Sequence, residues 1–301
     1  EAGQAALTFR ELGGGWQGAL KAIGWSVAFG VEGLVLGLAA AVGIGALVQG
    51  GTNAAWFSTP GLGQAFAQGA GLSIGFGIAT YHVGHRLLGR TWEDLRWRGA
   101  ASPGAWFGRG LVLGLAAAAV AMLIGLGVAG ARWSTGTGTL LGWSGSTLWT
   151  AGALALPALS EELIFRGVPL VLLAGVLGRW PAVVLTSVAF GLSHWNNPDV
   201  TLLGLTNISL AGVLLGTVFF GRGGIWAAWG AHLGWNLSLA ALGAPVSGLP
   251  LSMPWLEYHP GGPAWVSGGA FGPEGGILAS VAMMGATVIA SRWIPKGEAA
   301  T

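Results

Sequence analysis

Long apolar runs, separated by short polar or glycine-rich stretches, dominate this sequence of 301 residues. A helix needs about 20 apolar residues to cross the hydrocarbon core of a membrane, and no run has the alternating pattern of a barrel strand. Only 8% of the residues are charged, whereas a soluble domain has about a quarter, so the chain cannot cover a surface that faces water. The sequence therefore predicts an all-α fold, a polytopic membrane helix bundle with about eight transmembrane helices.

The apolar runs define the predicted spans, and several of the 17 tryptophans flank them as interface anchors do. The fourth run is long enough to be tilted, or to be broken near Pro157 and Pro169. We interpret residues 1–20 as an interfacial or disordered lead-in and residues 21–298 as a single transmembrane bundle without internal repeats. The predicted spans cover residues 22–48, 69–88, 111–130, 146–177, 181–194, 200–220, 225–242 and 275–294.

Basic residues indicate the orientation of the bundle. With eight spans, almost all of them fall on one side, and the positive-inside rule makes that side cytoplasmic. We therefore expect both termini in the cytoplasm, and the composition suggests an integral protein of a bacterial cytoplasmic membrane. With 13 basic residues in all, the charge mostly sets orientation, and we expect no nucleic-acid partner. The cytoplasmic set is Arg10, Lys21, the cluster within 86–109, Arg179, Arg222, Arg292 and Lys296, and the other side holds only Arg132.

The fourth predicted span contains three charged residues, Glu161, Glu162 and Arg166, within the apolar stretch 154–170. An ionisable residue inside a membrane costs at least a few kcal/mol, so it is interpreted by default as functional and as having a partner. The chain has no cysteine, which excludes disulfides and thiolate metal sites.

Candidate partners lie in two later spans. His194 ends the stretch FGLSH, and His232 and Asn236 lie one helical turn apart on one face in HLGWN. A rise of about 1.5 Å per residue places these residues at depths similar to that of Glu161. Because isolated charges in lipid cost far more than clustered ones, we expect these side chains to meet in one buried polar site.

These motifs resemble those of a known family, the CAAX prenyl protease 2 and bacteriocin-processing (CPBP, ABI) family of intramembrane proteases. The resemblance covers a catalytic core at about 145–240 and implies intramembrane proteolysis of a peptide or protein substrate at the lipid bilayer. The motifs, in the family's order, are Glu161-Glu162-x-x-x-Arg166, Phe190-x-x-x-His194 and His232-x-x-x-Asn236.

The resemblance implies that Glu161 and His194 activate a water and that His232 and Asn236 donate to the oxyanion. The chemistry suits these residue types, because an apolar setting raises the basicity of a carboxylate toward that of a general base. Glu162 and Arg166 are four residues apart on one helix, which favours a structural pair. Glu161, His194 and His232 could also bind a divalent metal such as zinc, and both mechanisms stay open.

Other functions also stay open. The chain could be a non-catalytic scaffold or immunity-type subunit of a larger membrane complex, with tryptophans and the loop 243–274 as contact surface. A rhomboid-type serine protease would use Ser144 in a GxSG sequence with His232, but leaves Glu161 without a role. Buried Glu and His residues also relay protons in transporters, although no repeat supports this class.

Three polar residues lie outside the motifs. His82 and His85 fall near a predicted cytoplasmic span end, where we expect them to face lipid headgroups. Glu32 lies in the first span and either lines the cavity or bonds within the bundle.

Overall fold

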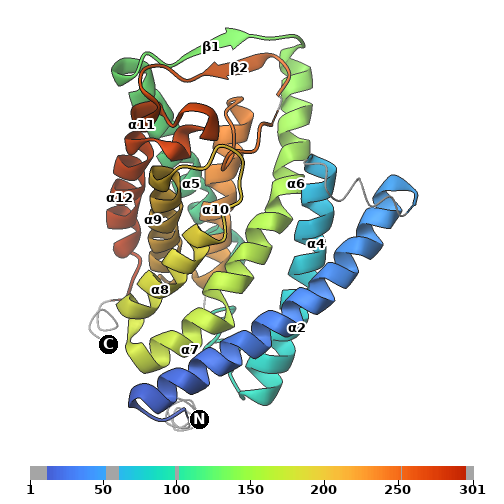
Figure 1. Cartoon of the computed structure of the whole chain (residues 1–301), viewed down its shortest axis with the longest axis vertical. Helices are drawn as coiled ribbons and strands as arrows, with labels where there is room; N and C mark the ends of the chain where they lie inside the picture. Colours follow the sequence, from blue (N-terminus) through green and yellow to red (C-terminus); the bar gives the residue numbers. More distant parts are fainter. Residues whose placement is uncertain (1–11, 52–60, 99–101, 252, 296–301) are drawn as a thin grey trace.

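The computed structural model describes residues 12–51, 61–98, 102–251 and 253–295. These residues form an almost entirely helical bundle (Figure 1), as predicted. Arg10 and Lys296, which contribute to the predicted orientation, lie outside the described residues. The main helices are α2 (Gly15–Gln49), α4 (Leu62–Ala79), the π-helix η1 (Thr80–Leu87), α5 (Pro103–Val128), α6 (Leu140–Arg166), α7 (Val168–Leu177), α8 (Arg179–Leu192), α9 (Leu202–Phe219), α10 (Gly224–Ala241) and α12 (Ile277–Ser291).

Each predicted span contains a helix, but several boundaries differ, and α4, α5 and α6 begin six to eight residues before the predicted spans. Helix α2 begins at Gly15, inside the predicted lead-in. The fourth span is two helices, because the backbone leaves the helical conformation at Gly167 (φ −76°, ψ −130°). Pro169 then lies in the first turn of α7, where a missing N–H costs nothing, whereas Pro157 stays inside α6 without breaking it.

Three helices among the described residues, α2, α5 and α9, are long and apolar enough to cross a membrane, and α8 and α12 are shorter apolar helices. The chain is therefore an integral membrane protein. The count of eight crossings stays a prediction.

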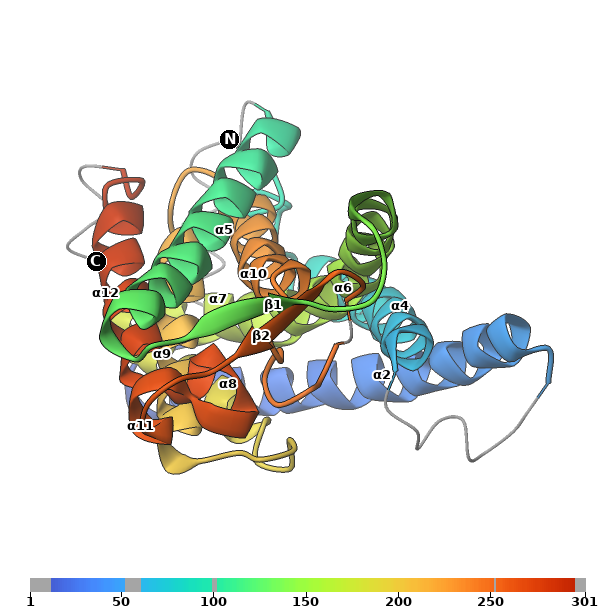
Figure 2. The ribbon, with the colours of Figure 1, turned by 90° about the horizontal axis from the view of Figure 1, so that it is seen from above.

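Helix α6 runs between two helix pairs (Figures 1 and 2), contacting α4 of the α2–α4 pair and α10 of the α5–α10 pair. The α5–α10 contact depends on small residues: a Cβ built on Gly110 would lie 2.0 Å from the carbonyl oxygen of Ala227. Backbones approach this closely in membrane bundles because glycine leaves room for them. Helix α10 is thereby held at the centre of the bundle, next to α6.

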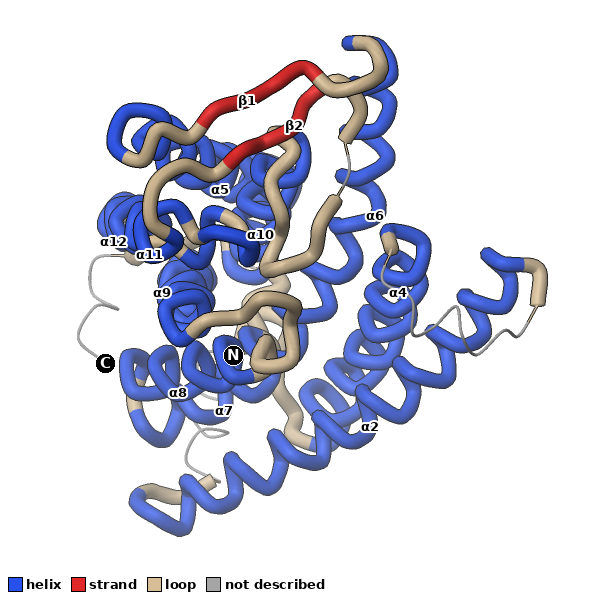
Figure 3. The backbone as a smooth tube through the Cα atoms, turned by 45° about the horizontal axis from the view of Figure 1, so that its top comes forward, coloured by secondary structure: helices blue, strands red, loops and turns tan. Residues whose placement is uncertain are grey.

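A cap of short elements covers one end of the bundle (Figure 3). Strands β1 (Arg132–Thr135) and β2 (Leu256–His259) pair antiparallel, and α11 (Ala264–Ser267), η2 (Gly269–Phe271) and η3 (Pro273–Gly275) follow. Trp133 in β1 donates its indole N–H to the carbonyl of Leu242 at 2.7 Å. This bond satisfies a carbonyl at the end of α10, where the helix cannot supply a donor. This sheet was not predicted from the sequence.

Candidate active site

Glu161 and Glu162 are neighbours on α6 in very different environments. The Glu162 side chain is 0% exposed, and its Oε1 accepts hydrogen bonds from Arg166 at 3.2 Å and from Nδ1 of His232 at 2.8 Å. Arg166 also lies over the ring of Phe190, 4.3 Å from its centroid. A buried carboxylate needs such partners, because an uncompensated charge would be costly there.

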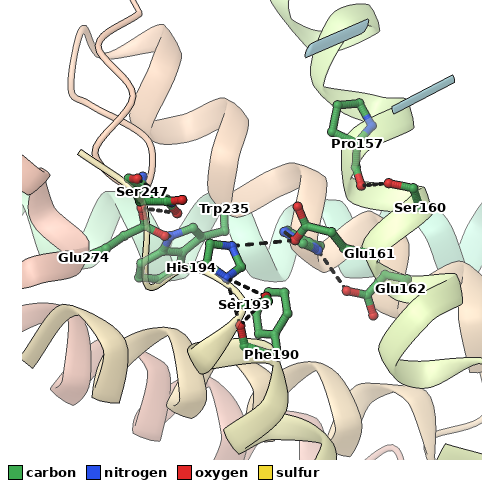
Figure 4. Close-up of polar contacts among 12 residues, drawn as sticks. Pro157, Ser160, Glu161, Glu162, Phe190, Ser193, His194, Trp235, Ser247 and Glu274 are labelled. Atoms are coloured by element: carbon green, nitrogen blue, oxygen red, sulfur yellow. Dashed lines mark hydrogen bonds and ion pairs between the residues drawn. The ribbon is translucent and has the colours of Figure 1, made fainter. Parts of the chain in front are cut away.

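Glu161 points instead into a cavity, toward two imidazoles. Its Oε2 lies 3.6 Å from Nε2 of His232 and 3.9 Å from Nε2 of His194, and its side chain is 31% exposed. Figure 4 shows Glu161 and His194 facing each other across this space. Direct hydrogen bonds are shorter than these separations, so the three groups surround a common point rather than bonding to one another.

The other ring nitrogen fixes each imidazole. Nδ1 of His232 donates to Glu162, and Nδ1 of His194, just after the end of α8, donates to the carbonyl of Phe190 at 2.8 Å. An imidazole with a donating Nδ1 has a free lone pair on Nε2 when it is neutral and a second N–H there when it is protonated. Both histidines are therefore oriented with Nε2 toward the same carboxylate oxygen of Glu161.

Glu161, His194, His232 and Asn236, the residues predicted as catalytic, line one cavity of about 380 Å³. Asn236 lies one helical turn after His232 on α10, which brings its amide to the same wall. Much of the remaining wall is apolar. Its apolar residues are Ala65, Leu154, Pro157, Ile164, Phe165, Phe190, Ile208, Ala211, Leu214, Leu215, Ala231, Trp235, Val246, Leu249 and Met283.

Two polar lining residues, Ser247 and Glu274, come from the segment 243–274 and were not predicted from the sequence. Glu274 is 4% exposed, and burial raises the pKa of its carboxyl group, although hydrogen bonds from Ser247 and Trp235 and the nearby His194 oppose this shift. The one available signal is an acidic residue just before the last apolar run. That signal is weak, because such an acid is usually solvated.

The candidate metal ligands meet only part of what a metal site requires. Glu161, His194 and His232 converge, and a carboxylate on Nδ1 of His232 is a common arrangement around a metal-binding histidine. Among the described residues, however, no group of three or more His, Asp or Glu side chains could hold a metal ion. Metal binding stays a prediction.

Ser144 lies far from this cavity. Its hydroxyl donates to the carbonyl of Leu140 at 2.9 Å in the first turn of α6, and the 17 residues to Glu161 span about 25 Å of helix. A serine–histidine pair between Ser144 and His232 is therefore not formed.

Glu32, His82 and His85 also lie outside the cavity. Glu32 of α2 accepts a hydrogen bond from Nδ1 of His82 in η1 at 2.8 Å, so it bonds within the bundle. His85 donates from Nδ1 to the carbonyl of Arg90 at 2.7 Å and stacks on Trp92, 5.2 Å between ring centroids. His82 is half exposed, whereas His85 is engaged by the segment that follows η1.

The fold and site define a class of protein: an integral membrane helix bundle with carboxylate, imidazole and amide groups around an internal cavity. Residues 143–238 match the family model of type II CAAX prenyl endopeptidase Rce1-like proteins. The resemblance inferred from the three motifs is thus confirmed over this segment, which is less than half of the chain. At the level of the family, the match supports a CAAX-type intramembrane protease. No curated protein and no solved structure matches the chain.

Proposed function

We propose that this protein is an intramembrane endopeptidase that hydrolyses a peptide bond at the membrane with a water activated by Glu161 and His194. The observation that carries this proposal is the position of Glu161 Oε2, 3.6 and 3.9 Å from two oriented imidazole nitrogens. A water at their common point can donate to Glu161 and to Nε2 of His194 and accept from a protonated Nε2 of His232, since bridging waters span polar atoms beyond direct hydrogen-bond reach. The match of the enclosing segment to a protease family supports the same reaction.

The reaction follows from these positions. Glu161 takes a proton from the water, and the resulting hydroxide attacks the carbonyl carbon of the peptide bond, whose oxygen becomes an oxyanion. Asn236 donates to that oxygen, and His232 donates to it from Nε2 when both of its ring nitrogens carry a proton. Glu161 then returns the proton to the leaving nitrogen as the carbon–nitrogen bond breaks.

The proposal includes a topology of eight crossings with both termini on the cytoplasmic side. The first turn of α2 and the last turn of α12 lie at the same end of the bundle, opposite the β1–β2 cap (Figure 1). With eight crossings, most of the basic residues lie on the same side as the termini, and the positive-inside rule makes that side cytoplasmic. A substrate would then reach the cavity from the membrane or from the cytoplasm.

Glu161→Gln tests the general-base role, with Glu257→Gln as the matched control because Glu257 is an exposed carboxylate on β2 outside the cavity. Turnover of a quenched fluorescent CAAX-type peptide in liposomes should fall about 10²–10⁴-fold in Glu161→Gln, the usual contribution of a general base. Glu257→Gln should match wild type. Wild-type turnover in Glu161→Gln would rule out Glu161 as the general base. A folded wild-type protein that has no turnover and co-purifies with a membrane complex would favour the scaffold function.

Chelation separates the metal-free mechanism from a metal-dependent one. We expect turnover to survive 1,10-phenanthroline and the purified protein to hold no stoichiometric zinc by mass spectrometry. Loss of activity that zinc restores would instead make Glu161, His194 and His232 metal ligands.

A further inference from the structure

A tight turn from the cap forms one wall of the cavity. Val246 and Leu249 exchange backbone hydrogen bonds of 3.0 and 2.9 Å around Ser247 and Gly248, whose φ angles are 49° and 83°. Positive φ at both central residues is the geometry of a type I′ turn. The residues 246–249, called the roof turn below, contribute Val246, Ser247 and Leu249 to the cavity lining.

The roof turn is held against the segment that carries His194. Asn197, three residues after His194, donates its side-chain amide to the carbonyl of Ser247 at 2.8 Å. A Cβ built on Gly248 would lie 2.1 Å from the carbonyl oxygen of Pro198, so the tip of the turn packs directly on this segment. Only glycine permits this approach.

Glu274 connects the roof turn to the helix that carries His232 and Asn236. Its Oε1 accepts from the indole N–H of Trp235 on α10 at 3.0 Å, and its Oε2 accepts from both the backbone N–H and the hydroxyl of Ser247. Figure 4 shows Glu274, Ser247 and Trp235 grouped on the side of His194 away from Glu161.

The backbone of Glu274 is itself fixed. Asn207 of α9 is fully buried and donates to the carbonyls of Glu274 and Gly276 at 2.7 and 2.8 Å. Asn207 accepts in turn from the hydroxyl of Ser280 on α12. The carboxylate is therefore presented from a rigid support on α9 and α12 rather than from a free loop.

We propose that Glu274 is a positioning residue of the hydrolytic site, because its carboxylate joins the roof turn and α10 and so fixes the two histidine-bearing segments relative to each other. This inference rests on the proposed function and extends it to an acidic residue outside the matched segment 143–238. Glu274 acts through Trp235 and Ser247, not on the substrate itself.

A carboxylate is required because donors approach both of its oxygens. Glutamine has one acceptor oxygen, so Glu274→Gln can satisfy either Trp235 or Ser247 and turns an N–H₂ group toward the other donor. One connection is lost while the size of the side chain is kept.

Steady-state kinetics on the full-length protein in liposomes tests the proposal. We expect Glu274→Gln to lower kcat about 10–100-fold, as loss of an orienting residue usually does, with KM within about threefold of wild type. Trp235→Phe should lower kcat similarly, and the double variant should lose little more because both changes break the same connection. An unchanged kcat in Glu274→Gln, or a change in KM alone, would overturn the positioning role.

Gly248→Ala perturbs the roof turn and leaves the Glu274 side chain in place. It should also lower kcat, whereas Gly285→Ala on α12, where a Cβ meets nothing within 4 Å, should behave as wild type. Gly248→Ala also carries the test if Glu274→Gln does not fold, and wild-type kcat in a folded Gly248→Ala protein would count against the roof turn.

Hydrogen–deuterium exchange distinguishes failure of this inference from failure of the proposed function. Exchange at 194–199 and 246–249 should rise in Glu274→Gln while the α5–α10 contact stays protected. If the wild-type protein has no peptidase activity, the proposed function fails, and this exchange result alone supports or overturns the connection made by Glu274.

Discussion

Replacing Glu162 by alanine should distinguish the roles of the two adjacent glutamates of α6, because only Glu162 is expected to stabilise the fold. The change removes the carboxylate oxygen that accepts hydrogen bonds from both Arg166 and His232. Arg166 is 1% exposed, so its guanidinium group would stay buried without this counter-charge. Nδ1 of His232 would lose its acceptor at the same time.

The size of the effect follows from burial. Removing one partner of a buried ion pair costs about 3–5 kcal/mol, because the remaining charge is left uncompensated. Glu161 is the matched control: its side chain is 31% exposed, and its Oε2 makes no hydrogen bond within the described part of the chain. Glu161→Ala should therefore change the free energy of unfolding by less than about 1 kcal/mol.

The assay is equilibrium unfolding in mixed micelles, followed by tryptophan fluorescence, together with peptide turnover on the same preparations. Both variants should lose activity, and only Glu162→Ala should lose stability. Exchanging both partners, as in Glu162→Leu with Arg166→Met, should recover the part of the loss that comes from the buried charge, whereas Nδ1 of His232 still lacks its acceptor.

A free energy of unfolding for Glu162→Ala within about 1 kcal/mol of wild type would mean that some other group compensates Arg166, and it would refute the role given to Glu162. Equal instability of Glu161→Ala and Glu162→Ala would refute it as well. That result would make Glu161 a structural residue and remove the distinction on which the mechanism depends.

Two further predictions concern the bundle around the site. Gly110→Ala places a Cβ 2.0 Å from a carbonyl oxygen of α10, so it should destabilise the protein by about 1–3 kcal/mol, the usual cost of overpacking. The control Gly108→Ala, whose Cβ meets nothing within 4 Å, should leave stability unchanged. Equal unfolding midpoints for the two variants would contradict the close α5–α10 contact. His82 bonds to Glu32 outside the cavity, so His82→Ala should keep wild-type kcat, whereas His194→Ala should lower kcat about 10²-fold or more. Comparable losses of kcat in the two variants would show that the cavity is not the reactive site.

The helices could be predicted because a membrane imposes one requirement on every span: a long apolar run that satisfies its own backbone hydrogen bonds. The small fraction of charged residues and the lengths of the apolar runs were sufficient to predict the helices. The break between α6 and α7 was predicted only to within a few residues, because Pro169 indicates a disruption whereas the change of backbone direction occurs at Gly167.

The convergence of Glu161, His194 and His232 was expected on energetic grounds, since isolated polar groups in lipid are unfavourable. Their orientation was not accessible from the sequence. Which nitrogen of His232 faces Glu161 depends on the Glu162 carboxylate, and a rotation of α10 by one residue, about 100°, would remove that bond. Spacing places residues on a helix face, but it does not fix the rotation of one helix against another.

The roof turn and Glu274 were missed for a different reason. Residues 243–274 are rich in glycine and proline and have no apolar period, so no local pattern predicts their conformation. Their structure depends on contacts distant in sequence, such as Asn207 with Glu274 and Asn197 with Ser247. A buried carboxylate there has the same local sequence as a solvated one, and only the donors that surround it in the fold distinguish the two. Acidic residues in the caps of membrane bundles therefore need to be judged by the donors they meet, because sequence pattern assigns them to solvent by default.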